Sequence, residues 1–413
     1  MKRLRHVLCA LILALSPGAA SALPAGSGAS DPSIVIGIVA TLTGPGAIGG
    51  QDLVDGFNLG LKQLGGRFGN QEVRVVVADD RGSPDTARQQ VRRLLERERL
   101  DVVLTGVSLP AMAAIVKPLV SARLFVVGLD QMPTELAGAE CSPWLFSVAP
   151  QADGVHEALG QLLAAERVRR LAVVGPDRPG TTEAVAALKR TFPGEVIAVL
   201  RPKPGATLFS AELAHIREQA PDAVYSLLTG GVGGAFVRAY AGSGLKVERP
   251  LYVPWQAVER PLLAAMGDAA LDVVSIAAWS PDFDLPANRR LLGDFESEFG
   301  RPATSWVAQG FDAALLLDGA LRATHGRTGD AETLRTALRR AEFASVRGGM
   351  RFNTNHFPVV TLVARKVVKD AKGRLTHETR TTVLKDWRDR HAAECPMRWA
   401  EEPAAAAAPV KKP

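Results

Sequence analysis

The pattern that most directly suggests ligand chemistry is a glycine-rich loop near the start of the chain. Residues 44–49 read GPGAIG and match G-x-G-x-x-G, the fingerprint of loops that bind dinucleotides. That fingerprint also needs an acidic residue about 20 positions further on. The acidic pair Asp79 and Asp80 comes about 30 positions after the loop. We therefore interpret the loop as one that lets the backbone approach a ligand or a facing domain, and we expect no cofactor.

The other reactive side chains do not match a catalytic or metal-binding pattern. The segment 106–110, GVSLP, departs at its last position from the G-x-S-x-G elbow of hydrolases. The histidines are spread along the chain, with no H-x-x-x-H spacing and no Cys/His cluster. We predict a protein that is not an enzyme and holds no metal. An exported hydrolase stays open as an alternative, because a Ser-His-acid set assembles in space.

Length and composition describe a globular protein with room for two medium-sized domains. The chain has 413 residues, of which 47% are hydrophobic and 22% are charged. Its formal net charge is +6, but Lys2, Arg3 and Arg5 lie in an N-terminal leader, and without these three it is about +3. The remaining Lys and Arg residues are scattered among acidic residues, so we expect no nucleic-acid partner.

The leader has the three parts of a secretory signal peptide. Its first residues are basic, a short apolar core follows, and Ala20-Ser21-Ala22 is a small-residue cleavage site. The core is too short to span a bilayer. We therefore predict a signal peptide over residues 1–22, cleaved near Ala22, a linker over 23–32, and an exported protein located in the periplasm.

Loss of the leader would remove Cys9 and leave Cys141 and Cys395. Two cysteines in an oxidising compartment predict one disulfide, which would tie the C-terminal segment to the body of the protein. Two unrelated thiols are the alternative.

Alternating strand and helix patterns predict a doubly wound α/β domain. Ile34–Ala40 has the length and the branched side chains of a buried strand. After the glycine loop, Leu53, Phe57 and Leu61 recur at helical spacing. Further strands are expected at 73–78, 102–105 and 124–127, each followed by a helical segment. Such units predict a parallel sheet that binds ligands at the carboxyl ends of its strands.

The same rhythm restarts after residue 150 and predicts a second α/β domain. Its strands are expected at 171–174, 196–200, 223–228 and 251–253. Segments 144–151 and 273–279 are expected to cross between the domains, and strands at 359–368 and 381–384 to return to the second. Residues 400–413 are rich in Ala, Pro and Lys and predict a disordered tail.

These features together resemble a known family. The motifs are VIGIVATLTGP in the first strand and loop, the Asp79–Asp80 pair, TGVS after the third strand, LDQMPTEL after the fourth, and WVAQGFDAALLLDGAL near Phe311. In order and spacing they resemble the leucine/isoleucine/valine-binding class of type I periplasmic solute-binding proteins. The resemblance implies two doubly wound α/β lobes joined by three crossovers, with lobe 1 at 33–149 plus 278–347 and lobe 2 at 150–277 plus 348–399.

The resemblance also implies ligand contacts in the loops of both lobes. In amino-acid binders of this class, a hydroxyl after the third strand helps to hold the ligand carboxylate, and Ser108, followed by Leu109, falls there. The helix that begins beside it offers the free N–H groups of Ala111 and Met112 to an anion. The other implied contacts are Ile48 in the first loop, Asp130 and Gln131 after the fourth strand, Pro179 and Thr229 in the second lobe, and Trp255 and Gln256 at the loop where the family carries a Glu.

The departure at Trp255 bears on the class of ligand. In the family the Glu pairs with the ligand ammonium, and a buried ammonium without a carboxylate costs several kcal/mol. A tryptophan wall suits a flat apolar or aromatic ligand instead. Our hypothesis is an organic acid, such as an aromatic carboxylate, held by Ser108 and capped by Trp255. An amino-acid-like ligand is the alternative, because Asp130 could hold its ammonium from the other lobe.

The resemblance finally implies a role and a partner. It implies an extracytoplasmic subunit of an ABC importer that captures a small-molecule solute by hinge closure and delivers it to a membrane permease. We expect a monomer. A periplasmic sensor that presents its solute to a receptor is the alternative.

Overall fold

The computed structural model describes residues 33–44, 46–260 and 262–397. The predicted signal peptide over 1–22, the linker over 23–32 and the tail over 400–413 lie outside the described residues. Within the described part of the chain, no helix has both the length and the apolar character needed to cross a membrane.

The first sheet has six strands in the order β2-β3-β1-β4-β5-β6, parallel except for the β2–β3 pair. Its strands are β1 (Ile34–Ala40), β2 (Arg67–Phe68), β3 (Gln71–Asp79), β4 (Val102–Gly106), β5 (Phe125–Gly128) and β6 (Leu145–Ser147). Every residue of β1 is buried, because the strand lies in the middle of a sheet covered on both faces. The apolar runs that predict strands in this lobe are therefore the interior of a three-layer α/β structure.

The second sheet has eight strands, with β12-β13-β11-β10-β9-β7-β8 in order and β14 paired to β13. Its strands are β7 (Arg170–Val174), β8 (Glu195–Leu200), β9 (Ala223–Ser226), β10 (Leu251–Pro254), β11 (Val274–Ala277), β12 (Arg351–Phe352), β13 (Pro358–Lys369) and β14 (Leu375–Trp387). Strands β7, β8, β9, β10 and β11 are parallel to one another. On the other side of β11, the pairs β11–β13, β13–β12 and β13–β14 are antiparallel.

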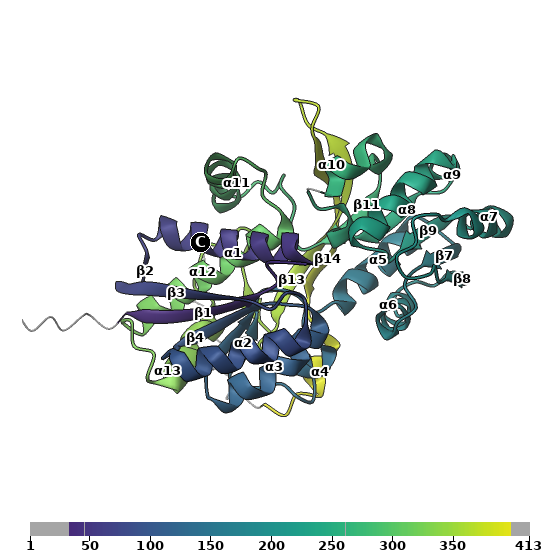
Figure 1. Ribbon diagram of the computed structural model, residues 1–413. Helices are drawn as coiled ribbons and strands as arrows, with labels where there is room; N and C mark the ends of the chain where they lie inside the picture. Colours follow the sequence, from purple (N-terminus) through teal and green to yellow (C-terminus); the bar gives the residue numbers. More distant parts are fainter. Residues whose placement is uncertain (1–32, 45, 261, 398–413) are drawn as a thin grey trace, which may run out of the picture.

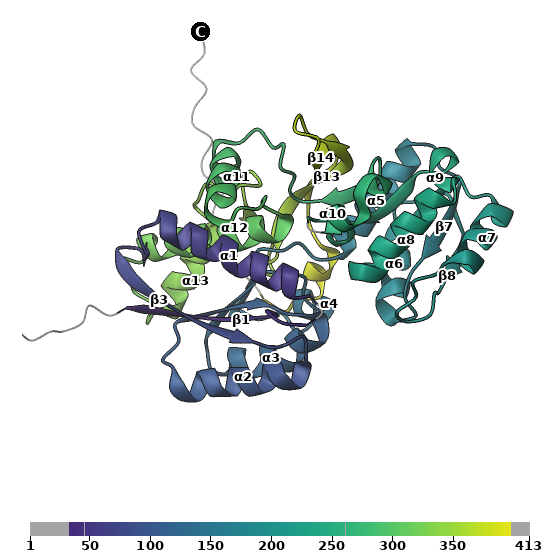
Figure 2. The same ribbon diagram turned by 45° about the horizontal axis from the view of Figure 1, so that its top comes forward.

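Helices cover both faces of each sheet (Figures 1 and 2). In the first lobe, α1, α12 and α13 pack on one face and α2 and α3 on the other; in the second, α5 and α6 oppose α7 and α8. The helices are α1 (Ala47–Gln63), α2 (Pro84–Arg97), α3 (Leu109–Ser121), α4 (Thr134–Ala137), α5 (Asp153–Ala165), α6 (Pro179–Lys189), α7 (Ser210–Gln219), α8 (Gly230–Gly242), α9 (Leu245–Glu248), α10 (Leu262–Met266), α11 (Pro286–Phe299), α12 (Ser305–Ala323) and α13 (Ala331–Arg340), with 3-10 turns η1 (Trp255–Val258), η2 (Gly267–Ala270) and η3 (Arg390–Ala393).

The chain passes three times between the lobes: from β6 to α5, from β11 to α11, and from α13 to β12. Arg347, in the third passage, donates to the carbonyl oxygen of Val148 in the first passage (2.7 Å) and pairs with buried Asp312 (2.7 Å). The two-lobe α/β fold with three crossovers that the sequence predicts is therefore present, and side-chain bonds tie the crossing strands to one another.

The two cysteines outside the predicted leader, Cys141 and Cys395, are bonded to each other, as the sequence predicts. The Cα atoms of Cys141 and Cys395 lie 5.6 Å apart, and the bridge spans 254 positions of sequence. Close by, η3 packs against α4 of the first lobe, and His391 lies 3.2 Å from Asp153 of α5. The end of the described chain is therefore held at the junction of the lobes.

Reducing this disulfide is expected to lower the free energy of unfolding by about 2–4 kcal/mol, because a closed loop limits the unfolded chain. Urea unfolding of the oxidised and reduced protein measures the difference, and Cys141→Ser should unfold like the reduced form. Identical midpoints with and without reductant would contradict a structural bridge.

Candidate functional site

The glycine-rich loop is the start of helix α1. Gly46, the residue before the helix, has φ = 93°, a left-handed conformation that favours glycine. Asp79 at the end of β3 holds the loop: its carboxylate accepts hydrogen bonds from the Leu42 N–H (2.9 Å) and the Thr43 hydroxyl (2.6 Å). The Asp79 carboxylate is thus bonded to the loop itself, whereas a dinucleotide site would use an acidic residue to bind ribose. Ile48, in the first turn of α1, is 44% exposed.

Ser108 precedes helix α3, and its hydroxyl makes no hydrogen bond with the described residues. It is the N-cap residue, yet its side chain accepts no capping hydrogen bond, and its Oγ has no partner among the described residues. The Met112 N–H, which the sequence suggests for anion binding, donates instead to the Ser108 carbonyl (2.8 Å). Leu109 beside it is 44% exposed. The start of α3 therefore presents an exposed hydroxyl next to a helix N-terminus.

The second lobe presents two similar helix starts. Pro179 is the first residue of α6, and Thr229 is the N-cap of α8, again without a side-chain capping bond. Gly230 follows with φ = 59°, and open space surrounds the position its Cβ would occupy. Both Pro179 and Thr229 are exposed. These positions are thus at strand ends of the second sheet, as the sequence expects of loops that face a ligand.

Trp255 lies at a buried junction between the lobes. Only 4% of it is exposed, and its ring meets that of Trp306, at the start of α12, edge to face at 5.0 Å between centroids. The Trp306 Nε1–H donates to Asp130 Oδ2 (3.3 Å), while Asp130 Oδ1 accepts from the Gln131 N–H (2.8 Å). Loss of water around this carboxyl group raises the pKa of Asp130. Asp130, Gln131 and Trp255 are therefore brought together through Trp306.

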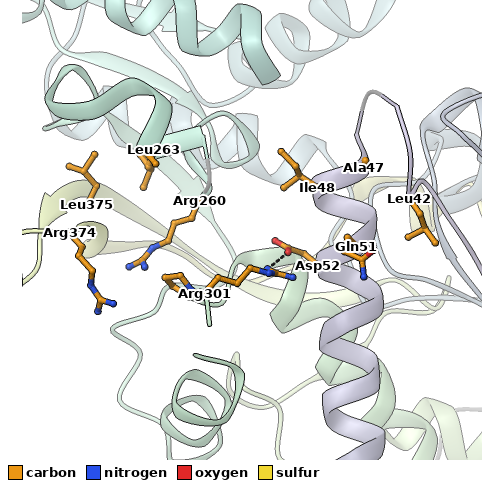
Figure 3. A pocket seen from close by; sticks show the side chains of 12 residues that line it. Leu42, Ala47, Ile48, Gln51, Asp52, Arg260, Leu263, Arg301, Arg374 and Leu375 are labelled. Carbon is orange, nitrogen blue, oxygen red and sulfur yellow. Dashed lines mark hydrogen bonds and ion pairs between the residues drawn. The ribbon is translucent and has the colours of Figure 1, made fainter. Parts of the chain in front are cut away.

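A large cavity opens between the lobes beside Ile48 (Figure 3). Its volume is about 670 Å³, within the roughly 300–1,000 Å³ of small-molecule pockets. It is lined by Leu42, Ala47, Ile48, Gln51, Asp52, Arg260, Leu263, Ala264, Arg301, Pro302, Arg374 and Leu375. In Figure 3, α1 forms one side, and Arg260, Leu263, Arg374 and Leu375 of the second lobe lie opposite.

Of the nine ligand contacts that the sequence suggests, two line the cavities described here. Ile48 lines the large cavity, and Trp255 lines a narrow one with Trp279, Ser305 and Arg347. Ser108, Leu109, Asp130, Gln131, Pro179, Thr229 and Gln256 line neither. The three arginines of the large cavity are not among the contacts that the sequence suggests. Arg260 could have been suggested, because it follows Trp255 by five positions.

A buried ion pair of the second lobe lies where that lobe meets the first. Glu259, just after η1, pairs with Arg365 of β13, and both side chains are almost fully buried. Glu259 also accepts a hydrogen bond from the Ser305 hydroxyl at the start of α12 (2.6 Å). Arg365 donates further to the Trp279 carbonyl oxygen (3.2 Å). The second lobe is thereby fastened to helix α12 of the first.

Asp52, which lines the cavity from α1, carries an unusual proton affinity. Burial raises the pKa of its carboxyl group to about 6, although Arg301 and the Thr304 hydroxyl (2.7 Å) bind its ionised form. The folded state therefore binds a proton on Asp52 more tightly than the unfolded chain does. Between about pH 4 and pH 6 this difference makes stability fall as pH rises.

We expect this loss to disappear in Asp52→Asn, which cannot titrate. The free energy of unfolding of the wild type, measured relative to the variant, should fall by about 2 kcal/mol between pH 4 and pH 6, because this window covers most of a shift of about two pKa units at about 1.4 kcal/mol per unit. Urea unfolding of both proteins across this range gives the two profiles. Parallel profiles would show that Asp52 titrates normally.

Comparison with known proteins agrees with the geometry. A family model described as "Periplasmic binding protein" matches residues 33–372. A Leu/Ile/Val-binding protein homolog 6 of Brucella abortus is 22% identical over 323 residues, covering 76% of this chain and 82% of the relative.

Solved structures give the same picture. An ABC transporter substrate-binding protein from Sphaerobacter thermophilus is 26% identical, with a TM-score of 0.80 over 86% of this chain and 99% of that one. A solute-binding protein of an ABC transporter from R. palustris, in complex with benzoate, is 24% identical, with a TM-score of 0.80 over 89% and 100%. The chain therefore belongs to the periplasmic binding protein family and is a type I solute-binding protein of the kind that serves ABC transporters.

Proposed function

We propose that this protein captures a small organic carboxylate between its two lobes and delivers it to the membrane permease of an ABC importer. The observation that carries the proposal is the uncommitted, exposed hydroxyl of Ser108 at the N-terminus of α3. A hydroxyl and a helix N-terminus together favour a negatively charged group. The solute would bind unchanged, so we assign a binding role and not a catalytic one.

The surroundings of Trp255 favour a carboxylate over an α-amino acid. The position that carries an ammonium-binding Glu in the family is a buried indole here, packed on Trp306. Asp130, the alternative counter-ion, already accepts two hydrogen bonds, and its raised pKa disfavours the ionised form that an ammonium needs. The benzoate bound by the R. palustris protein supports the same class of solute.

The family supports an extracytoplasmic location, and we place the mature protein in the periplasm after cleavage near Ala22, acting as a monomer with its permease. Solute that contacts both lobes would favour the closed arrangement over the open one. The equilibrium would shift only as far as the difference in affinity allows.

A thermal-shift panel on the mature protein tests the solute class. Benzoate, 4-hydroxybenzoate and hexanoate are compared with leucine, valine and phenylalanine. A ligand present at about 100 times its dissociation constant should add about 2.7 kcal/mol to stability. We expect one or more carboxylates to raise the melting temperature and the amino acids to leave it unchanged. A shift with the amino acids alone would contradict the proposal.

Ser108→Ala is expected to weaken binding of the best carboxylate about 10- to 100-fold, because a hydrogen bond to a charged group contributes about 1.5–3 kcal/mol. Ser121→Ala, at the other end of the same helix, is the matched control and should bind as the wild type does. Calorimetric titration measures both. Equal loss in the two variants, or no loss at Ser108, would remove this residue from the site.

A further inference from the structure

The cavity between the lobes has the chemical make-up of a site for an amphipathic anion. Its apolar side chains come from both lobes: Leu42 and Ile48 from the first, and Leu263 and Leu375 from the second. Three arginines share the cavity with them, namely Arg260, Arg301 and Arg374, and Figure 3 shows the three guanidinium groups along one side of it. Asp52 is the acidic residue among the lining side chains.

The charges of two of these arginines are already balanced within the protein. Arg301 pairs with Asp52 and with Asp55 on α1. Arg374 lies 2.7 Å from Glu296 and 2.8 Å from Asp370. Neither guanidinium needs a further anion.

Arg260 differs from them. It is half-buried, and among the described residues it makes no hydrogen bond and no ion pair. Its neighbour Glu259 points into the buried pair with Arg365 and is not available to it. Loss of water and the nearby charge of Arg374 lower the pKa of Arg260, and the charges of the acids that pair with Arg374 and Arg365 offset this only in part. An anion bound beside Arg260 would supply a counter-charge that favours the ionised guanidinium.

We propose that this cavity is a second binding site of the protein, in which Arg260 binds the carboxylate of an organic anion and the leucine and isoleucine side chains hold its apolar body. The cavity shares Ile48 with the ligand contacts that the family resemblance implies but does not include Ser108, so it can be filled whether or not Ser108 holds the solute. A guanidinium is suited to this task because its planar donors match the two oxygens of a carboxylate. The volume of about 670 Å³ admits a fused-ring or medium-chain acid.

The occupant would touch both lobes, since Ile48 and Gln51 lie on α1 and Arg260 lies in the second lobe. An anion seated here would therefore favour one separation of the lobes over others. The site adds an influence on closure that does not pass through the loop of Ser108.

Titration of 1-naphthoate and of its neutral isostere, 1-naphthamide, tests the site. The proteins are the wild type, Ser108→Ala, Arg260→Gln, Arg260→Lys and, as a matched control, Arg92→Gln on the exposed face of α2. We expect naphthoate to bind Ser108→Ala with an affinity within about threefold of one wild-type site, and Arg260→Gln to weaken that site at least tenfold. Arg260→Lys should recover part of the loss, and naphthamide should bind weakly to all.

Several outcomes would overturn the proposal: equal naphthoate affinity in Arg260→Gln and wild type, equal affinity for the amide, or no naphthoate binding by any of the proteins. Loss of binding in Ser108→Ala alone would assign the anion to the solute site and equally overturn it. Phenylglyoxal, which modifies accessible guanidinium groups, locates the site without a variant. Naphthoate should protect Arg260 from modification in a peptide mass map and leave Arg92 unprotected.

Discussion

Replacing Glu259 by glutamine is expected to lower the free energy of unfolding by about 3–5 kcal/mol. The change keeps the size of the side chain but leaves the Arg365 guanidinium, which is fully buried, without its counter-charge. Breaking a buried ion pair on one side has this cost because the remaining charge stays out of water. The hydroxyl of Ser305 loses its charged acceptor at the same time.

Asp272→Asn is the matched control. Asp272 pairs with Lys366, the neighbour of Arg365 on β13, at 3.3 Å, but its side chain is 73% exposed. An exposed pair contributes about 0–1 kcal/mol, so this variant should unfold close to the wild type. Urea unfolding at pH 7 compares the three proteins. If Glu259→Gln matches Asp272→Asn, the buried pair does not stabilise the junction of the lobes.

The packing of α1 against α12 should be equally intolerant of a single methyl group at Gly310. A Cβ there would lie 2.0 Å from the carbonyl oxygen of Leu53 on α1, and a backbone atom cannot turn aside. We expect Gly310→Ala to cost about 3 kcal/mol or more, at the upper end of overpacking effects. The two helices would have to separate along the face that covers the first sheet.

Gly293→Ala, on helix α11, is the control, and we expect it to raise stability where Gly310→Ala lowers it. Open space surrounds the position of its Cβ, and alanine is the better helix former by about 0.5–1 kcal/mol. This variant should be slightly more stable than the wild type in the same thermal or urea measurement. If the two substitutions changed the free energy of unfolding by the same amount in the same direction, the close approach of the helices at Gly310 would be contradicted.

The sequence predicts the parallel strands well because their apolar runs record burial on two faces. The run Ile34–Ala40 is β1 with the same limits. The last antiparallel strand is harder to predict: a strand is expected over 381–384, whereas β14 covers Leu375–Trp387. Most of β14 is half-buried or exposed, so its side chains follow no apolar run, and only its pairing with β13 makes it a strand.

The candidate site is predicted less completely, since it depends on distances that sequence spacing does not carry. The loop positions of Ser108 and Thr229 follow from strand–helix alternation, and both precede helices as expected. The burial of Trp255 depends on Trp306, which is 51 positions later in the chain. Likewise, Arg260 and Arg374 share a cavity only because the β13–β14 hairpin returns to the second lobe.

Solute bound between the lobes is expected to draw them together. Small-angle X-ray scattering of the mature protein, with and without a saturating amount of the carboxylate that gives the largest thermal shift, tests it directly. We predict a smaller radius of gyration with the carboxylate and an unchanged radius with a carboxylate that gives no thermal shift. An unchanged radius at proven saturation would contradict capture by closure of the two lobes.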